Sequence, residues 1–455
     1  MSDRLTLDDL SRFSGEPPER LRDWQDKGLL GARDGSGEFR REDIEGVRLI
    51  HLCLRRGISI DSIVEAEATS RLIDRYIELV APSSVTRKYS IAEAAEAAGM
   101  DIESVRAMWT ATGFAGEQGD SLGEDDIEAM LVFKTLADAG FPPNALAEGA
   151  RVYADSCARI AEMESKLFHF YIHRRLEAQG LSGEELNRAL DRAGDLATPS
   201  IEPTLLYFHR KSWQRAIRDD WVMHIAEEAG LLKSGDVPGQ LQAAVVFIDL
   251  SSFTPMTDAM GDAAAAAVLE RFSSIVRRSV GDFGGRIIKQ IGDAFMLVFQ
   301  DVRSAVACAL EVEAESAREP QFPAARAGIT WGDVLYREGD YVGTNVNIAS
   351  RLASEADRHQ VLVTAEVRRE GAGTPGIEFV GLGKRALKGL GGRFELFAAS
   401  SADTTSAEKH IDPVCGMEMS DAEVSARLTL EGEDRCFCSE DCLRKFIAAP
   451  DRYGR

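Results

Sequence analysis

The segment QAAVVFIDL at residues 242–250 limits what this chain can fold into more than any other stretch. Its apolar run suits a buried strand and leads into the carboxylate of Asp249. Patterns typical of a helix, a hairpin with the turn Gly292-Asp293, a second helix and a further strand pair follow, as far as residue 339. This order of strand, helix, two strands, helix and strand predicts an α+β domain. We expect a small, ferredoxin-like antiparallel sheet covered by helices on one face.

Two carboxylates occupy comparable positions in this pattern, Asp249 at the end of the first strand and Asp293 in the hairpin turn. Adjacent carboxylates repel each other unless a cation joins them. Hard oxygen ligands without a nearby His or Cys favour Mg2+ or Mn2+. Taken singly, Asp249 could instead be a helix N-cap and Asp293 an ordinary turn residue. The pair is therefore a candidate cation site, with both local alternatives open.

Length and charge bound the class of protein. A chain of 455 residues is too long for one core, and length alone suggests about three domains. The net charge of -22 disfavours a broad surface for nucleic acid or acidic membranes. No apolar run approaches the ~18 residues of a membrane span, and the start MSDRLTLDDL lacks a signal-peptide core. We therefore expect a cytoplasmic protein without a membrane partner.

Two all-α segments, predicted as modules at residues 1–80 and 84–150, repeat each other. The matching positions are Gly15 and Gly99, Trp24 and Trp109, the pairs Asp43-Ile44 and Asp126-Ile127, and Gly57 and Gly140. Each segment has the pattern of helix, turn, helix, short loop or hairpin, and longer helix. Both resemble the winged helix-turn-helix domain of MerR-type regulators, and the first is the closer match.

The charge of these two modules bears on DNA binding. Residues 1–70 hold 11 Lys+Arg against 15 Asp+Glu, and residues 84–150 hold 4 against 12. A domain that reads a DNA groove needs basic contacts to phosphates. DNA binding is therefore open but disfavoured, and a helical regulatory role is favoured.

Residues 151–232 have apolar side chains at three- and four-residue spacing, which predicts an all-helical segment. We expect it to couple the N-terminal modules to the sheet domain and to help the chain dimerise. Its four histidines, which are His169, His173, His209 and His224, are interpreted as packing or surface residues rather than as metal or haem ligands. Residues 233–240, KSGDVPGQ, have the composition of a linker.

Three motifs occur in order, VVFIDLSSFT, IIKQIGDAFMLVF and GDYVGTNVNIASRLA. Together they resemble the catalytic domain of class III nucleotide cyclases over residues 241–399. By this resemblance Asp249 and Asp293 bind two Mg2+ or Mn2+ ions, Lys289 and Asp340 read the base, and Asn347 and Arg351 serve the transition state. The resemblance also implies a head-to-tail homodimer, in which the first pair and the other four residues of each site come from different chains.

Further substrate contacts are expected around these motifs. Phe253 and Thr254 belong to SSFT, where backbone N–H groups opening a helix can hold phosphate oxygens. Lys388 in LKGL is a candidate triphosphate contact or simply a surface lysine. Asn347 and Arg351 are four residues apart in a helical stretch, so they share one face.

Hydrogen bonding favours ATP as the substrate and cyclic AMP as the product. Adenine offers an acceptor at N1 and a donor at its 6-amino group, which match a donating Lys289 and an accepting Asp340. Guanine has the donor and the acceptor in the opposite places, so neither side chain would be matched. Each unpaired buried group costs about 1–3 kcal/mol. Two alternatives stay open, a guanylate cyclase and a transcription regulator whose cyclase-like domain only binds nucleotide.

Four of the seven cysteines crowd into the last 41 residues. The motifs DPVCGM and FCS in residues 410–455 resemble a YHS domain, a small metal-associated module. By this resemblance Cys415, Cys438 and Cys442 are thiolate ligands, which suit Zn2+ or Cu+. Cys436 stands where an aromatic residue is usual, and is a fourth sulfur ligand or a free thiol. A metal-free module is the alternative; with metal bound, we expect occupancy to tune the catalytic domain.

Overall fold

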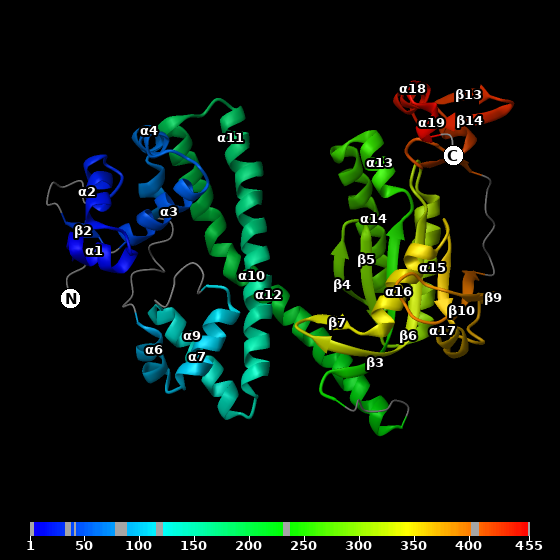
Figure 1. Cartoon of the computed structure of the whole chain (residues 1–455), viewed down its shortest axis with the longest axis horizontal. Helices are drawn as coiled ribbons and strands as arrows, with labels where there is room; N and C mark the ends of the chain where they lie inside the picture. Colours follow the sequence, from blue (N-terminus) through cyan, green and yellow to red (C-terminus); the bar gives the residue numbers. More distant parts are fainter. Residues whose placement is uncertain are drawn as a thin grey trace. The chain divides into compact units, whose positions relative to one another are not determined.

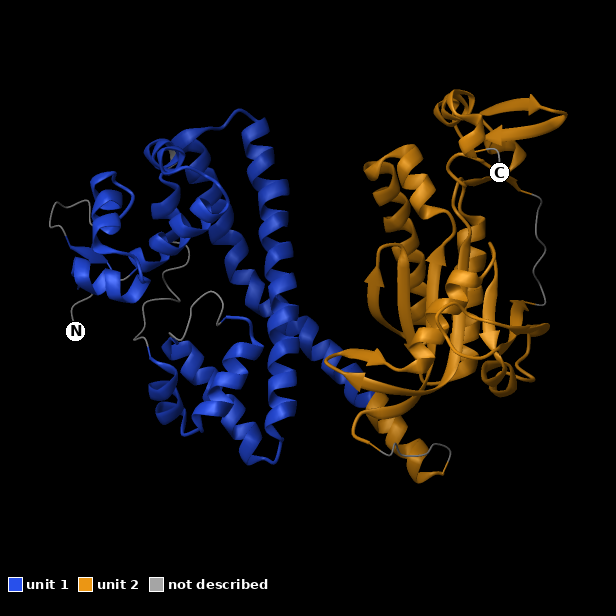
Figure 2. Cartoon of the chain, in the orientation of Figure 1, with its two compact units in different colours: residues 1–218 blue, residues 219–455 orange. Residues whose placement is uncertain are grey.

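The computed structural model of the chain describes residues 4–31, 38–40, 42–77, 89–114, 122–230, 237–401 and 409–453. It divides into two compact units, residues 1–218 and 219–455 (Figure 2). Residues 233–236 of the predicted linker at residues 233–240 lie outside the described residues. Residues 78–80, at the end of the first predicted module, also lie outside them. Within the described residues, no helix is both long and apolar enough to cross a membrane.

The first helical module has a small two-stranded wing beside its helices. Its elements are β1 (Arg4–Leu5), α1 (Leu7–Ser14), α2 (Pro18–Asp26), β2 (Phe39–Arg40), α3 (Asp43–Arg55) and α4 (Ile60–Ser70). Helix α1 ends at Gly15, whose φ of 74° suits a residue without a Cβ. Trp24 of α2 is buried, and strands β1 and β2 pair antiparallel. This is the winged helix-turn-helix arrangement that the sequence predicts.

The second module repeats this arrangement. Its helices are α6 (Ile91–Ala98), α7 (Ile102–Ala111) and α9 (Glu124–Asp138). Gly99 ends α6 with φ 62°, Trp109 of α7 is buried, and a bridge between Tyr89 and Leu122 stands where β1 and β2 pair in the first module. Asp43 and Asp126, which occupy matched positions in the sequence, also make the same kind of contact: each accepts a backbone N–H from three residues earlier. Asp43 accepts the N–H of Arg40 at 2.7 Å, and Asp126 accepts the N–H of Gly123 at 2.7 Å.

Long helices follow these modules. They are α10 (Pro143–Leu167), the π-helical turn η1 (Phe168–His173), α11 (Arg174–Ala178) and α12 (Gly183–Glu228). Figure 1 labels the three α-helices. On η1 the rings of His169 and His173 pack edge to face, 5.2 Å apart, and His224 of α12 lies 3.4 Å from Asp220. These contacts fit packing and surface roles. Helix α12 also exposes many large apolar side chains, among them Leu196, Leu206, Phe208, Trp213, Trp221 and Ile225.

The sheet domain, residues 240–401, is built on eight strands. They are β3 (Gln240–Leu250), β4 (Arg286–Ile291), β5 (Ala294–Phe299), β6 (Ala325–Arg337), β7 (Asp340–Val342), β8 (Val361–Thr364), β9 (Ile377–Arg385) and β10 (Phe394–Ser401). Their order is β4-β5-β3-β6-β8-β10-β9, with β7 on β6. Every pairing is antiparallel except that of β6 with β8. The predicted α+β order holds. The strand pair expected up to residue 339 is instead one continuous strand, β6, and β7 to β10 extend the sheet further.

Both faces of the sheet carry helices. The helices are α13 (Phe253–Met260), α14 (Asp262–Asp282), α15 (Val302–Arg318), α16 (Thr344–Glu355) and α17 (Ala365–Glu370). Side chains of α14 and α15 share one buried cluster with Val246 and Ile248 of β3, whereas α16 packs with Val245 and Phe247 on the opposite face. The expectation of helices on one face is therefore wrong for α16.

A glycine explains why α16 lies so close to the sheet. An ideal Cβ on Gly328 of β6 would lie 2.3 Å from the backbone nitrogen of Ala353 and 2.4 Å from the carbonyl oxygen of Ala349, both in α16. A side chain at this position would hold the helix away from the strand. The helix backbone therefore rests directly on β6.

The C-terminal module, residues 409–453, belongs to the same compact unit as the sheet domain. Its elements are β11 (His410–Ile411), β12 (Glu418–Met419), η2 (Asp421–Glu423), β13 (Ala426–Leu430), β14 (Glu433–Phe437), α18 (Glu440–Ala448) and α19 (Pro450–Tyr453), drawn in red shades in Figure 1. Val414, Met417 and Phe437 are buried in the same cluster as Ile248 and Phe272 of the sheet domain. The module therefore shares the sheet domain's core.

A buried carboxylate reinforces this contact. The side chain of Glu418 is only 4% exposed, and three basic groups surround it: Arg358 Nε at 3.1 Å, His359 Nε2 at 2.6 Å and Lys409 Nζ at 3.7 Å. Burial raises the pKa of Glu418, but His359 and Arg358 outweigh burial and leave that pKa below its usual value. The other ring nitrogen of His359 lies 2.7 Å from Glu313 of α15. His359 therefore joins a carboxylate of the module to one of the sheet domain.

We expect the contact between the two parts to weaken as the pH rises. Hydrogen bonds to Glu313 and then Glu418 raise the pKa of His359 from 6.5 to about 9. A raised folded-state pKa gives a stabilisation that is complete below pH 6.5 and is lost as the pH rises through about 9. The melting temperature of the full chain should therefore fall over this range, and the fall should be smaller in His359→Gln.

The control is His410→Gln, which removes a histidine of the same module that pairs with Asp421 instead. It should keep the pH dependence of the wild-type melting temperature. Equal pH dependence in His359→Gln and the wild type would contradict the assignment.

Candidate active site and thiol cluster

The strand order brings the two predicted acidic residues together. Asp249 is the penultimate residue of β3, and Asp293 lies in the two-residue turn that joins β4 to β5. Gly292 takes the φ of 63° that this turn requires. Because β5 pairs with β3 up to Ile248 opposite Phe295, the turn comes beside the end of β3. The predicted adjacency of Asp249 and Asp293 follows from this register.

The acidic pair shows the repulsion expected of two close carboxylates. Burial, followed by the hydrogen bond to Asp249 and its charge, raises the pKa of Asp293 to about 7. A cation between the two groups would remove this repulsion, and their four oxygens suit a hard divalent ion. The residues present therefore fit Mg2+ or Mn2+. The N-cap alternative for Asp249 is wrong, because the N-cap of α13 is Ser252.

A third charged residue, Arg326, belongs to this site and was not among the residues predicted from the sequence. Arg326 of β6 is the register partner of Asp249, and its guanidinium lies 2.9 Å from the Asp249 carboxylate. The sequence did contain a sign of it, because Arg326 interrupts the otherwise apolar strand AARAGIT. Only the pairing of β3 with β6 shows which carboxylate it meets.

The two predicted base-reading residues also meet. Lys289 of β4 donates a hydrogen bond to Asp340 Oδ2 at the start of β7, and Asp340 Oδ1 accepts the N–H of Tyr341 at 2.8 Å. Both side chains are about one-third exposed, at 37% and 35%. A solute can therefore reach the pair.

Strand registers place this pair on the same face of the sheet as Asp249. Lys289 lies opposite Met296, and Met296 lies opposite Phe247. Residues paired across strands share a face, and so do residues two apart in one strand. The face shared by Lys289, Phe247 and Asp249 is the one on which α16 packs.

Helix α16 carries Asn347 and Arg351, both exposed and one turn apart. The hydroxyl of Thr330 donates to the carbonyl of Asn345 at 3.0 Å, and the Asn345 amide donates to the Asp333 carbonyl at 2.9 Å. These bonds fix the first turn of α16 on β6. Within the described chain, neither Asn347 nor Arg351 hydrogen-bonds to Asp249 or Asp293.

The remaining predicted substrate contacts lie at the surface of the sheet domain. Phe253 and Thr254 are the first two residues of α13; Phe253 packs partly against the core, and Thr254 is exposed. Lys388 is exposed in the turn that follows β9. Helix α13 therefore begins four residues after Asp249, with its first N–H groups close to Asp249 in sequence.

The predicted thiols of the C-terminal module lie in one cluster. Cys415, Cys438, Cys442 and Asp412 are all buried, and one ligand atom from each lies within 4.8 Å of the others. The sulfur of Cys438 is 3.5 Å from that of Cys415 and 3.7 Å from that of Cys442. Cys436 is buried but stands outside the cluster, on β14 opposite Arg427. The fourth-sulfur alternative for Cys436 is therefore wrong.

Asp412 was missed in the sequence, although it stands three residues before Cys415 in DPVCGM. Its carboxylate accepts the N–H groups of Val414 and Cys438, each at 2.8 Å. Hydrogen bonds from Cys415 and Cys438 lower the pKa of the Cys442 thiol, whereas those with Cys438 and Cys442 raise the pKa of Cys415. Three sulfurs and one oxygen fit a tetrahedral thiophilic cation.

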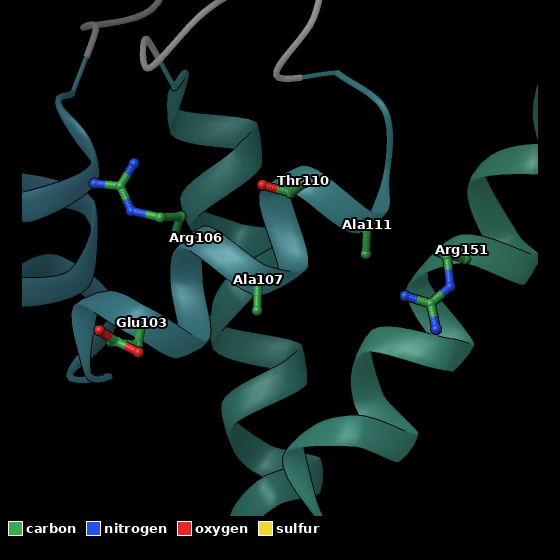
Figure 3. Close-up of a pocket in the computed structure, with 6 residues that line it drawn as sticks. All are labelled: Glu103, Arg106, Ala107, Thr110, Ala111 and Arg151. Atoms are coloured by element: carbon green, nitrogen blue, oxygen red, sulfur yellow. The ribbon is translucent and has the colours of Figure 1, made fainter.

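A separate pocket of about 520 Å³ lies in the N-terminal unit, between α7 and α10 (Figure 3). Its lining residues are Glu103, Arg106, Ala107, Thr110, Ala111 and Arg151. None of the predicted catalytic residues belongs to it.

Comparison with known proteins shows which families parts of this chain are similar to. Residues 238–400 match the model of the adenylate and guanylate cyclase catalytic domain, and residues 5–69 match that of the MerR HTH family of regulatory proteins. The chain is 30% identical to an adenylate cyclase of Streptomyces coelicolor over 289 residues, which are 62% of this chain and 72% of the relative. It is 29% identical to an adenylate cyclase of Glutamicibacter nicotianae, over 61% of this chain and 70% of the relative.

Among solved structures, the adenylyl cyclase CyaB of P. aeruginosa is 21% identical, with a TM-score of 0.32 over 37% of this chain and 98% of that one. The family follows from the catalytic-domain match at residues 238–400 and from 30% identity across most of the Streptomyces coelicolor relative. The chain belongs to the class III adenylate and guanylate cyclase family.

Proposed function

We propose that this chain is an adenylate cyclase, which converts ATP to 3′,5′-cyclic AMP and pyrophosphate at sites formed by a homodimer. The observation that carries the proposal is the adjacent pair Asp249 and Asp293, on the same face of the sheet as the pair Lys289 and Asp340. The relatives whose names describe them as adenylate cyclases support the choice of reaction.

In the proposed reaction, the 3′-hydroxyl of the nucleotide attacks the α-phosphate and pyrophosphate leaves. Two divalent cations held by Asp249 and Asp293 would lower the pKa of this hydroxyl and neutralise phosphate charge. The N–H groups that open α13 at Phe253 and Thr254 hold phosphate oxygens. Arg351 offsets the charge that grows on the α-phosphate, and Asn347 orients the ribose.

The base is chosen by the pair at β4 and β7. Lys289 can donate to adenine N1, and Asp340 can accept from the 6-amino group, so ATP fits better than GTP. In the structure these two side chains bond to each other. Each thus keeps a partner until the base replaces it. Lys388 is exposed and is proposed as a triphosphate contact.

The first test compares Asp293→Asn with the wild type in the conversion of ATP or GTP with Mg2+ or Mn2+. Asn keeps the size of the side chain but removes the charge that holds cations, so turnover should fall by about 100-fold or more. The matched control is Asp282→Asn at the exposed end of α14, which should keep wild-type turnover. Near-normal turnover in folded Asp293→Asn would overturn the metal assignment, and a preference for GTP would overturn the choice of base.

The homodimer is supported by two features of one chain. Arg351 and Asn347 make no hydrogen bond to the acidic pair within the described chain, which fits a site completed by a second copy. Helix α12 exposes large apolar side chains, including Trp213 at 59% and Trp221 at 63%, and such a helix is normally covered. We propose that α12 helps to pair two chains about a two-fold axis.

Mixing two inactive variants tests the shared site. Asp249→Ala and Arg351→Ala should each be nearly inactive alone, because every site in their homodimers is defective. A mixed dimer has one site with both defects and one with neither. With random exchange about half of the dimers are mixed, so activity should return to about one quarter of wild type. Chains that demonstrably exchange and recover no activity would refute the shared site; Asp249→Ala mixed with Asp293→Ala should not recover, because both defects affect the same half of the site.

The N-terminal modules are proposed as regulatory rather than DNA-binding, although residues 5–69 match a family of HTH regulators. Helix α2, the second helix of the motif, exposes three acidic and two basic side chains. Arg20 is already paired with Glu16 at 2.7 Å, and Asp23 with Lys27 at 2.6 Å. This surface offers little net positive charge to a phosphate backbone.

The buried cluster of the C-terminal module is proposed to bind Zn2+ or Cu+. The purified full chain, under reducing conditions, should retain about one equivalent of either metal. Changing Cys415, Cys438 and Cys442 together to Ser should abolish this binding, whereas Cys436→Ser should preserve it because Cys436 stands outside the cluster. Metal content near zero in the wild type, or equal loss in Cys436→Ser, would count against the site.

A further inference from the structure

The turn that carries Cys415 lies directly against the loop that opens α13. Gly416 has φ 72°, and an ideal Cβ placed on it would lie 2.6 Å from the Cβ of Ser252. Within the turn, the N–H of Gly416 donates to the carbonyl of Asp412 at 2.8 Å, and the N–H of Asp412 donates to the carbonyl of Met417 at 2.9 Å. The cluster and the loop are therefore separated by a single glycine.

Arg358 joins the same two segments. Its Nη1 donates to the hydroxyl of Ser252 at 3.2 Å, its Nη2 to the carbonyl of Gly416 at 2.7 Å, and its Nε to Glu418 at 3.1 Å. The planar guanidinium thus holds a side chain of the sheet domain and two groups of the module in one fixed geometry. No other basic residue type offers this set of directed donors.

Ser252 is a residue whose conformation needs such support. It takes the left-handed region, with φ 66° and ψ 23°, although it has a Cβ. It follows Asp249 by three residues and directly precedes Phe253 and Thr254. A change at Ser252 therefore alters both the phosphate-binding N–H groups and the connection to the acidic pair.

We propose that the C-terminal module is an intramolecular regulator of the cyclase, which acts through Gly416 and Arg358 on Ser252. Binding of a thiophilic cation at the cluster repositions the turn at residues 412–416, and the turn repositions the loop that holds the triphosphate. Arg358 is a positioning residue in this scheme, since it touches Ser252 and not the reacting atoms. The scheme rests on the proposed cyclase function for its effect on catalysis.

Other contacts hold the module in place independently of Arg358. Lys445 donates a hydrogen bond to the carbonyl of Ala259, and Arg452 pairs with Asp258 at 3.2 Å, both near the end of α13. The shared apolar core adds to these contacts. Loss of Arg358 should therefore uncouple the module from the loop without releasing it.

The test compares Arg358→Met with Arg452→Met in the full chain. Both remove an arginine at the same interface, but only Arg358 touches Ser252. Arg358→Met should raise KM for ATP by about tenfold and speed hydrogen exchange of residues 250–256 by a similar factor. Arg452→Met should leave KM for ATP and this hydrogen exchange at wild-type values. Arg358→Lys should return them only part of the way from the Arg358→Met values to those of the wild type. Equal results for the Met variants would overturn the proposal.

Metal addition supplies the second readout. Zn2+ added to metal-free wild type should change hydrogen exchange of residues 250–256, and this response should disappear in Arg358→Met. Ser252→Gly suits the left-handed region and removes the side chain that Arg358 contacts. It should also abolish the response to Zn2+, and it replaces Arg358→Met in this test if that variant does not fold. A response that persists in Ser252→Gly would refute the coupling.

The two proposals fail in different ways. If the wild type makes no cyclic nucleotide while exchange still responds to Zn2+ through Arg358, the cyclase function is wrong and the coupling stands. If cyclic AMP forms normally while Arg358→Met leaves KM and loop exchange unchanged, the coupling is wrong and the cyclase function stands.

Discussion

The mutual repulsion of Asp249 and Asp293 is the constraint on which the rest of the site depends. Three antiparallel strands are needed to create it, because β3 delivers one carboxylate and the β4–β5 turn delivers the other. The arrangement raises the pKa of Asp293 to about 7, so ionising both carboxylates is costly. A sheet that served only as a scaffold would gain nothing from placing two acids there. The cost makes sense where cations and a triphosphate are to be bound.

The two faces of the sheet differ in what they carry. One face is closed by α14 and α15, which supply most of the large core. The other carries Asp249 and Lys289, and is covered in part by α16, which Gly328 lets approach the strand. Asn347 and Arg351 remain exposed on that helix. A face with this chemistry and incomplete cover is suited to a second copy of the chain.

The C-terminal module is better described as an extension of the catalytic unit than as an independent appendage. Its cysteines and phenylalanines are buried in the core that α14 and α15 also form, and Glu418 is held by basic groups from both parts. A short segment with little apolar area of its own gains stability from such sharing. The same sharing brings its thiol cluster within one residue of the loop that begins α13.

Much of this protein was determined by the sequence alone, because the information was local. Strand and helix order follows from apolar periodicity, the Gly292-Asp293 turn from its residue types, and the repeated N-terminal modules from glycines and tryptophans at matched positions. The acidic pair, the pair Lys289 and Asp340, and three of the four cluster residues could be named for the same reason, with the family resemblance supplying their expected roles.

Tertiary structure decided what depends on contacts between distant segments. Strand register made Arg326 the partner of Asp249, and packing put α16 on the second face of the sheet. Asp412 rather than Cys436 completes the cluster because the turn at residues 412–416 folds back over Cys438. At the meeting of Gly416, Arg358 and Ser252, Arg358 contacts residues that lie 106 and 58 positions away in the chain. No local pattern encodes such a contact, since it exists only once the module has docked on the sheet domain.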